Sequence, residues 1–186
     1  LKDGIIRPSR SPYNSPTWVV DKKGTDAFGN PNKRLVIDFR KLNEKTIPDR
    51  YPMPSIPMIL ANLGKAKFFT TLDLKSGYHQ IYLAEHDREK TSFSVNGGKY
   101  EFCRLPFGLR NASSIFQRAL DDVLREQIGK ICYVYVDDVI IFSENESDHV
   151  RHIDTVLKCL IDANMRVSQE KTRFFKESVE YLGFIV

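Results

Sequence analysis

The run CYVYVDDVIIF, from Cys132 to Phe142, constrains the fold of this chain more than any other stretch. Nine of its eleven residues are apolar or aromatic, which is typical of a strand buried on at least one face. Asp137 and Asp138 interrupt that run in its middle. Two adjacent carboxylates in such a setting repel each other and lose hydration, so the pattern calls for a source of opposite charge.

The order of the predicted elements indicates an α+β fold. KFFTTLDL predicts a strand that ends near Asp73, and helices are expected over residues 112–127 and 148–163, with the Asp-Asp hairpin between them and a strand after them. This is the split βαββαβ pattern, a four-stranded antiparallel sheet backed by two helices. In that pattern the strands that carry Asp73 and the Asp-Asp pair are the two central, adjacent strands.

Both helices are predicted from apolar residues at helical spacing. The inward residues of the first are expected to be Ile115, Phe116, Ala119, Leu120, Val123 and Leu124. Those of the second are expected to be Ile153, Val156, Leu157, Leu160 and Ile161. Ser147 is the predicted N-cap of the second helix, and Asp148 near its start suits the helix dipole.

The remaining segments predict a second, loop-rich lobe. SPTWVV and KRLVIDF read as strands on either side of a turn-rich tip, and KTSFSV and KYEFCRL read as a hairpin around NGG. Residues 48–64 contain four prolines before a short helix that Gly64 is expected to end.

Composition sets bounds on the class of protein. The 186 residues correspond to one domain or one compact unit with subdomains. The net charge of +4 is compatible with a polyanionic partner. Cys103, Cys132 and Cys159 are odd in number and widely spaced, which indicates neither a disulfide framework nor a zinc site. No apolar run is long enough for a membrane span. The last residues read as an apolar strand, so we expect a fragment of a longer polyprotein.

Asp73, Asp137 and Asp138 are therefore expected to converge at one edge of the sheet. No His or Cys accompanies them, and the four histidines form no ligand pattern. All-oxygen coordination suits Mg²⁺ or Mn²⁺, and two such ions would support phosphoryl transfer. The alternative is ordinary turn chemistry for the Asp pair and a strand-end cap for Asp73.

Three motifs together resemble the catalytic palm of a reverse transcriptase. They are LDLKSGYHQI at 72–81, LPFGLRNASSIFQ at 105–117 and YVDD at 135–138. SPYNSPTWVVDKK and RLVIDFRKLN are similar to that family's fingers, and EYLGFIV is similar to its primer grip. The resemblance covers essentially the whole chain and is closest to polymerases of gypsy-like LTR retrotransposons.

This resemblance implies a division of the chain. Residues 1–48 and 81–106 would form the fingers, and residues 49–80 and 107–186 would form the palm, with the thumb and later domains absent. The primer-grip hairpin is expected to need residues beyond Val186.

The resemblance also implies roles for individual residues. Asp73, Asp137 and the Leu74 carbonyl would bind the metal ions directly. Asp138 would complete the acidic cluster, either as a further direct ligand or as a residue that contacts the ligands without binding the metal. The nucleotide-binding residues would be Lys22, Arg34, Ser76, Gly77, Tyr78 and Phe107. Among these, Tyr78 would be the steric gate against a 2′-hydroxyl, and Ser76 and Gly77 would offer backbone N–H groups to phosphate.

Further roles concern the template, the primer and the leaving group. The template and primer contacts would be Gly108, Tyr135, Val136, Tyr181, Leu182 and Gly183. Lys171 resembles the lysine that protonates pyrophosphate, and a solvated loop lysine is the alternative. This chain has Ser113 and Ser114 near the start of the predicted helix, whereas many relatives carry a proline there.

The function implied is RNA- and DNA-templated DNA synthesis from dNTPs with two Mg²⁺ ions, or Mn²⁺ in their place. The partners implied are an RNA template, a DNA primer, their duplexes, and the remaining Pol domains: thumb, RNase H, protease and integrase. The implied location is intracellular, in cytoplasmic virus-like particles. The alternatives are a catalytically inactive nucleic-acid-binding domain and a metal-dependent nuclease.

Overall fold

The computed structural model describes residues 1, 3–25 and 29–186, and the chain divides into two compact units. Unit 1 comprises Leu1–Pro48 and Ile81–Ala112, and unit 2 comprises Asp49–Gln80 and Ser113–Val186. No helix within the described ranges is both long and apolar enough to cross a membrane. The expected tip of the first hairpin includes residues 26–28, which lie outside the described residues.

Unit 1 contains a small sheet and a long hairpin. The sheet has the strand order β1–β6–β5, and the hairpin pairs β2 with β3. The bounds are β1 Ile6–Pro8, β2 Thr17–Thr25, β3 Pro31–Ile37, α1 Arg40–Lys45, α3 Glu85–Arg88, η2 Glu89–Thr91, β5 Phe93–Val95 and β6 Gly98–Phe102. The hairpin expected around NGG is confirmed, with Asn96 and Gly97 both at positive φ as its turn requires. Phe39, Phe93 and Phe102 form the core.

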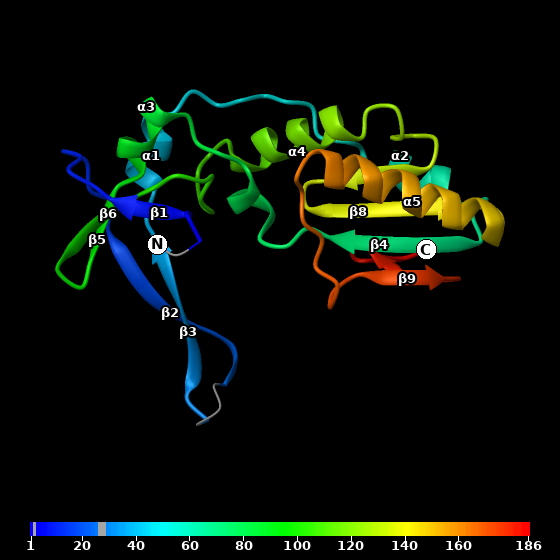
Figure 1. Ribbon diagram of the computed structural model, residues 1–186, viewed down its shortest axis with the longest axis horizontal. Coiled ribbons are helices and arrows are strands. Elements are labelled where there is room, and N and C mark those ends of the chain that lie inside the picture. Colours follow the sequence, from blue (N-terminus) through cyan, green and yellow to red (C-terminus); the bar gives the residue numbers. More distant parts are fainter. Residues whose placement is uncertain (2, 26–28) are drawn as a thin grey trace. The chain divides into compact units, whose positions relative to one another are not determined.

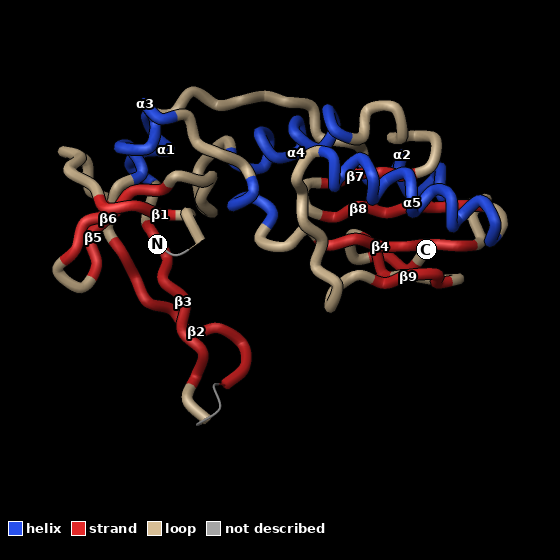
Figure 2. Tube along the Cα trace, in the orientation of Figure 1, coloured by secondary structure: helices blue, strands red, loops and turns tan. Residues whose placement is uncertain are grey.

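Unit 2 is built on a four-stranded antiparallel sheet with the order β7–β8–β4–β9. The bounds are α2 Ile56–Leu63, β4 Phe68–Asp73, η1 Gly77–Gln80, α4 Ala112–Val123, β7 Cys132–Tyr135, β8 Asp138–Ser143, α5 Glu146–Asp162, β9 Arg173–Lys176, β10 Glu180–Tyr181 and β11 Phe184–Ile185. The sequence of β4, α4, β7, β8, α5 and β9 is the predicted βαββαβ pattern, so the predicted fold class is confirmed (Figures 1 and 2).

The two faces of this sheet are covered by different elements. Side chains alternate along each strand, so Phe69 of β4 and Ile140 of β8 share one face. That face packs against Ile59 of α2 and Tyr181 of β10. The other face carries Thr70 and is covered by α5, which runs along β8 and β4 in Figure 1. The strands β7, β8 and β4 are therefore largely buried, whereas all four residues of β9 are exposed.

Helix α5 differs from the prediction at its start and on its buried face. Its N-cap is Asn145, whose side chain accepts the Asp148 N–H, so the prediction of Ser147 is wrong. Ile161 is 67% exposed, because it lies about 100° around the helix from the buried Leu160. His149 takes an inward position instead and is fully buried.

The structure also tests three predictions about where helices and a hairpin end. Helix α4 ends at Val123, and turns replace the expected last turn to Gln127. Helix α2 ends at Gly64 as expected, although Gly64 keeps a right-handed helical φ. The hairpin of β10 and β11 closes within the chain, because Leu182 and Gly183 both take the positive φ of a two-residue turn. The expectation that this hairpin needs residues beyond Val186 is therefore wrong.

His149 links α5 to the sheet through both of its ring nitrogens. Nε2 lies 2.8 Å from Thr70 Oγ1, and Nδ1 lies 2.8 Å from Ser143 Oγ. Burial, with a smaller effect from His152, lowers the pKa of His149. The folded state therefore disfavours protonation of His149.

We predict that unfolding becomes easier as the pH falls below about 6.5, the ordinary histidine pKa. Below that value the unfolded chain binds a proton that folded His149 resists, so stability is lost at up to about 1.4 kcal/mol per pH unit from this group. Urea unfolding between pH 7.5 and 5 measures this dependence. His149→Gln should flatten it, and His86→Gln, at an exposed position, is the matched control. Equal slopes in wild type and His149→Gln would contradict the assignment.

Candidate active site

The carboxylates of Asp73 and Asp138 are placed by strand register. Asp73 is the last residue of β4, Asp138 is the first residue of β8, and the two are direct cross-strand partners. Asp137 precedes Asp138 in the loop that joins β7 to β8. Both residues of the Asp pair are exposed, so they lie at the open end of the strands rather than inside the sheet.

The loop between β7 and β8 consists of only Val136 and Asp137. Val136 has a φ of 54°, in the left-handed region that β-branched residues rarely adopt. Such a conformation costs on the order of 1–3 kcal/mol and persists only where the surroundings hold it. The turn that presents Asp137 is therefore strained and needs a support.

Gln117 of α4 provides that support. Its side chain is fully buried, and its Oε1 accepts the Val136 N–H at 2.6 Å. Its Nε2 donates to Asp121 Oδ1 at 2.8 Å and to the Val134 carbonyl at 3.3 Å. Asp121 in turn accepts the Tyr51 hydroxyl at 2.7 Å, and this hydrogen bond is the main cause of a raised pKa of Tyr51.

Sequence reasoning missed Gln117 as a supporting residue. The available signal was a polar residue beside the inward Phe116 of the predicted helix. An amide at a buried helix position needs partners for both its oxygen and its nitrogen. The strained turn supplies one of those partners, which the sequence could not show.

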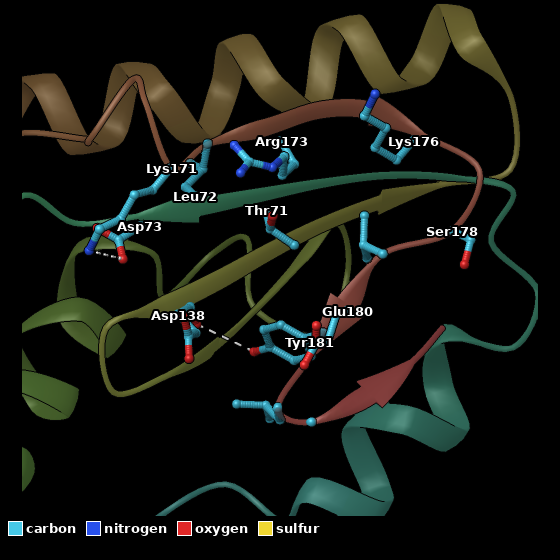
Figure 3. A pocket seen from close by; sticks show the side chains of 13 residues that line it. Thr71, Leu72, Asp73, Asp138, Lys171, Arg173, Lys176, Ser178, Glu180 and Tyr181 are labelled. Carbon is cyan, nitrogen blue, oxygen red and sulfur yellow. Dashed lines mark hydrogen bonds and ion pairs between the residues drawn. The ribbon is translucent and has the colours of Figure 1, made fainter. Parts of the chain in front are cut away.

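Lys171 lies beside Asp73. Its Nζ is 3.1 Å from Asp73 Oδ2 and 3.3 Å from Oδ1, and Figure 3 shows the two side chains pointing toward each other. The pKa of Asp138 is raised by loss of hydration and by the charges of Asp137 and Asp73, and Lys171 opposes this rise. The three carboxylates and the lysine therefore act on one another electrostatically.

The donor set fits a hard divalent cation. Within the described ranges, no three acidic, His or Cys side chains are already close enough to form a metal site. Two of the carboxylates are nevertheless cross-strand neighbours, the third is adjacent in sequence, and all their donor atoms are oxygen. Oxygen donors are the ligands that Mg²⁺ and Mn²⁺ prefer.

The chain turns sharply after Asp73. The Leu74 carbonyl accepts the Gly77 N–H at 3.1 Å, and Ser76 has a φ of 52°. The Gly77 N–H, which the sequence predicts to face phosphate, is thus engaged inside the turn. A Cβ on Gly77 would lie 2.8 Å from Phe116 Cζ, so the missing side chain allows this turn to approach α4 closely. Tyr78 follows, with its ring edge-on to Phe116 at 5.4 Å between centroids.

A cavity of about 590 Å³ is lined by Asp73 and Asp138 and by residues of β9 and of the β10–β11 hairpin. Tyr181 is buried in its wall, and its hydroxyl lies 3.4 Å from the Asp138 carbonyl (Figure 3). Leu182 and Gly183 form the turn of the hairpin and also line the cavity. Tyr135, half-buried, is the cross-strand partner of Asp138 in β7. These predicted primer-contact residues therefore gather on the same side as the carboxylates.

In unit 1, Lys22 and Arg34 share one face of the β2–β3 hairpin. Arg34 pairs with Val20, and Lys22 lies two residues after Val20, so the two exposed cations are diagonal neighbours. Lys33 pairs with Asp21 on the opposite face, where their charges offset each other. Among the described residues, one face of the hairpin therefore brings two exposed positive charges close together.

The predicted template loop of unit 1 is fastened to α1. The Asn43 side chain donates to the Gly108 carbonyl at 2.8 Å and accepts the Arg110 N–H at 2.7 Å. Gly108 has a φ of 90°, which explains the glycine. Phe107 is 56% exposed, so it does not fill a core.

We predict that Gln117→Leu destabilises unit 2 by about 1–3 kcal/mol, because it leaves buried polar groups without partners. The amide of Val136 should then exchange with solvent faster, which hydrogen exchange measured residue by residue will detect. Gln127→Leu, the same change outside this network, is the control. Unchanged protection of the Val136 amide in Gln117→Leu would contradict the proposed support.

The comparisons with known proteins agree with this geometry. The family model "Reverse transcriptase (RNA-dependent DNA polymerase)" matches residues 20–186. The chain is 58% identical over its whole length to the retrovirus-related Pol polyprotein from transposon opus of Drosophila melanogaster, and 52% identical to that from transposon 297 of the same organism. It spans 18% of the length of each of these relatives.

A solved structure extends the likeness to three dimensions. The foamy viral protease-reverse transcriptase in complex with an RNA/DNA hybrid superposes with a TM-score of 0.88 and 28% identity, over 99% of this chain and 24% of that chain. The predicted resemblance is confirmed. The chain belongs to the reverse transcriptase family, and its relatives include the Pol polyproteins of gypsy-like LTR retrotransposons.

Proposed function

We propose that this chain is the catalytic part of a DNA polymerase that copies RNA and DNA templates. The observation that carries the proposal is the cross-strand pairing of Asp73 with Asp138 at the open end of the two central strands, with Asp137 in the adjoining turn. An all-oxygen acidic edge of this kind suits phosphoryl transfer assisted by Mg²⁺ or Mn²⁺. The family supports the same reaction.

In the proposed reaction the primer 3′-hydroxyl attacks the α-phosphorus of a dNTP. A bond forms between the primer oxygen and that phosphorus, the bond from the α-phosphorus to the bridging oxygen of the β-phosphate breaks, and the hydroxyl gives its proton to water. The products are a primer longer by one nucleotide and pyrophosphate. Two divalent ions held by Asp73 and Asp137, with the Leu74 carbonyl and Asp138, would lower the pKa of the hydroxyl and offset charge on the triphosphate.

The other residues have roles that follow from their charge and position. Arg34 and Lys22, on one face of the hairpin, would bind the triphosphate. Lys171, beside Asp73, is placed to offset negative charge and is our candidate for protonating pyrophosphate. Tyr78 would be the steric gate, and Ser76 and Phe107 would line the nucleotide site.

We propose that residues 1–48 and 81–106 are the fingers and that residues 49–80 and 107–186 are the palm, so residues 107–112 of unit 1 would belong to the palm. Gly108 would contact the template, and Tyr135, Val136 and the β10–β11 turn would contact the primer. A foamy viral relative is described in complex with an RNA/DNA hybrid, which supports such a duplex as the partner here. The matched relatives are Pol polyproteins of which this chain spans 18%, so we propose that it works together with further Pol domains.

We predict that Asp73→Asn and Asp137→Asn each reduce primer extension more than about 100-fold, because loss of even an outer partner of a metal ligand costs about 10–100-fold. The assay is Mg²⁺-dependent extension of oligo(dT) on poly(rA) by the protein that carries this chain. Titration calorimetry with Mn²⁺ should show weakened binding, and circular dichroism should show an intact fold.

Asp154→Asn, at an exposed position on α5, is the matched control and should keep full activity. Near wild-type extension by Asp73→Asn or Asp137→Asn would contradict the metal assignment. Duplex binding without any extension by the wild type would favour an inactive binding domain, and cleavage of the template would favour a nuclease.

We predict that Arg34→Ala raises the KM for dNTP about 10- to 100-fold, the range expected for loss of hydrogen bonds to a charged group. The Kd for primer–template should stay within about twofold, because the guanidinium would contact the triphosphate and not the duplex. Steady-state kinetics and fluorescence anisotropy measure the two quantities. Lys33→Ala, on the opposite face of the same strand, is the control. Equal losses in both quantities would identify Arg34 as a structural residue.

A further inference from the structure

The Tyr78 hydroxyl is held by a residue of α4 that has no assigned role. Tyr78 Oη lies 2.8 Å from Ser113 Oγ, and both residues belong to unit 2. Ser113 stands in the first turn of α4, and Phe116, one turn later, meets the Tyr78 ring edge-on with an interplanar angle of 84°. One helix face therefore contacts both the ring and the hydroxyl of Tyr78.

These two contacts restrict different motions of the ring. Phe116 is fully buried, and the absence of a Cβ on Gly77 lets the backbone before Tyr78 lie directly against it. This packing locates the base of the tyrosine side chain. The hydroxyl is the atom farthest from Cβ, so a small rotation about χ1 displaces it more than any other atom of the ring. The bond to Ser113 restrains that displacement.

We infer that Ser113 is a positioning residue for the nucleotide selectivity of this polymerase. This inference rests on the proposed function, in which the Tyr78 ring excludes a ribonucleotide 2′-hydroxyl. A steric barrier discriminates only if it cannot move aside, because a ring that swings away makes room for the extra oxygen. The hydroxyl of Ser113 holds the ring in the excluding position, so the sugar selectivity depends on Ser113 as well as on Tyr78.

Ser113 is suited to this role without being needed for folding. Its bond to Tyr78 is exposed, so water competes for both hydroxyls and the contribution to stability is small. The first turn of a helix also tolerates many residue types, since its N–H groups have no partners within the helix. Loss of this hydroxyl should therefore change selectivity with little change in thermal stability.

The neighbouring serine supplies a matched control. Ser114 differs from Ser113 by one position, and its hydroxyl donates to the Asp49 carbonyl at 3.3 Å. Ser114→Ala removes the same group from the same helix turn without touching Tyr78. It should retain the wild-type preference for dNTP over rNTP.

The experiment compares kcat/KM for dTTP and UTP in single-nucleotide extension by the protein that carries this chain together with its other Pol domains. Ser113→Ala should lower the dTTP/UTP ratio about three- to tenfold, the range that one uncharged hydrogen bond supplies. Ser113→Thr keeps a hydroxyl and should restore most of the ratio. Tyr78→Phe removes the other partner and should cause a similar loss.

The double variant Ser113→Ala/Tyr78→Phe decides between positioning and an indirect effect. If the hydroxyl pair is the cause, the double variant should lose no more selectivity than either single variant. Additive losses, an unchanged ratio in Ser113→Ala, or an equal loss in Ser114→Ala would each overturn the inference while polymerization itself persists. Absence of extension by the wild type would instead overturn the proposed function on which the inference rests.

Discussion

The site depends on one register, the antiparallel pairing of β4 with β8 that makes Asp73 and Asp138 direct partners. Because side chains alternate along a strand, a slip of one residue would send one of these carboxylates to the opposite face of the sheet. The apolar residues behind them prevent that slip. Phe69 and Phe142 pair on the face that packs against α2, while Leu72 and Val139 pair on the face covered by helices, and Leu72 and Val139 are fully or almost fully buried. The packing of the hydrophobic core thereby keeps the Asp73 and Asp138 carboxylates next to each other.

Side chains on α4 and α5 hold the residues that surround the paired carboxylates. Gln117 accepts the backbone N–H of Val136, whose φ lies in the left-handed region, and so stabilises the strained turn that contains Asp137. Ser113 and Phe116, on the same helix, hold Tyr78. On α5, His149 connects Thr70 and Ser143 behind the sheet. Gln117, Ser113 and His149 form hydrogen bonds to residues of other elements or turns, and Phe116 packs against the Tyr78 ring. Helices α4 and α5 therefore support the residues around the paired carboxylates as well as covering the core.

The sequence allowed the element order of unit 2 and the adjacency of its central strands to be predicted, because long apolar runs and helical spacing report burial directly. Prediction from the sequence was wrong or incomplete where the position of a side chain depends on contacts that the local pattern does not show. His149 displaced Ile161 from the expected inward set because hydroxyls on two strands satisfy both of its nitrogens. Asn145 capped α5 in place of Ser147 because the helix begins earlier than the apolar spacing indicates. The hydrogen bond from the Gly77 N–H to the Leu74 carbonyl is a further contact that the motif alone does not show.

By itself the sequence determined the family, the order of strands and helices, and the identity of the acidic and basic residues proposed for chemistry. Motif residues and hydrophobic periodicity are local properties, so they can be read along the chain. Only the tertiary structure decided that Lys171 lies 3.1 Å from Asp73, that Lys22 and Arg34 share a hairpin face, and that Ser113 rather than Ser114 meets Tyr78. These contacts join residues through strand register and helix rotation, and such geometry is set by how the whole core packs, which no single segment encodes.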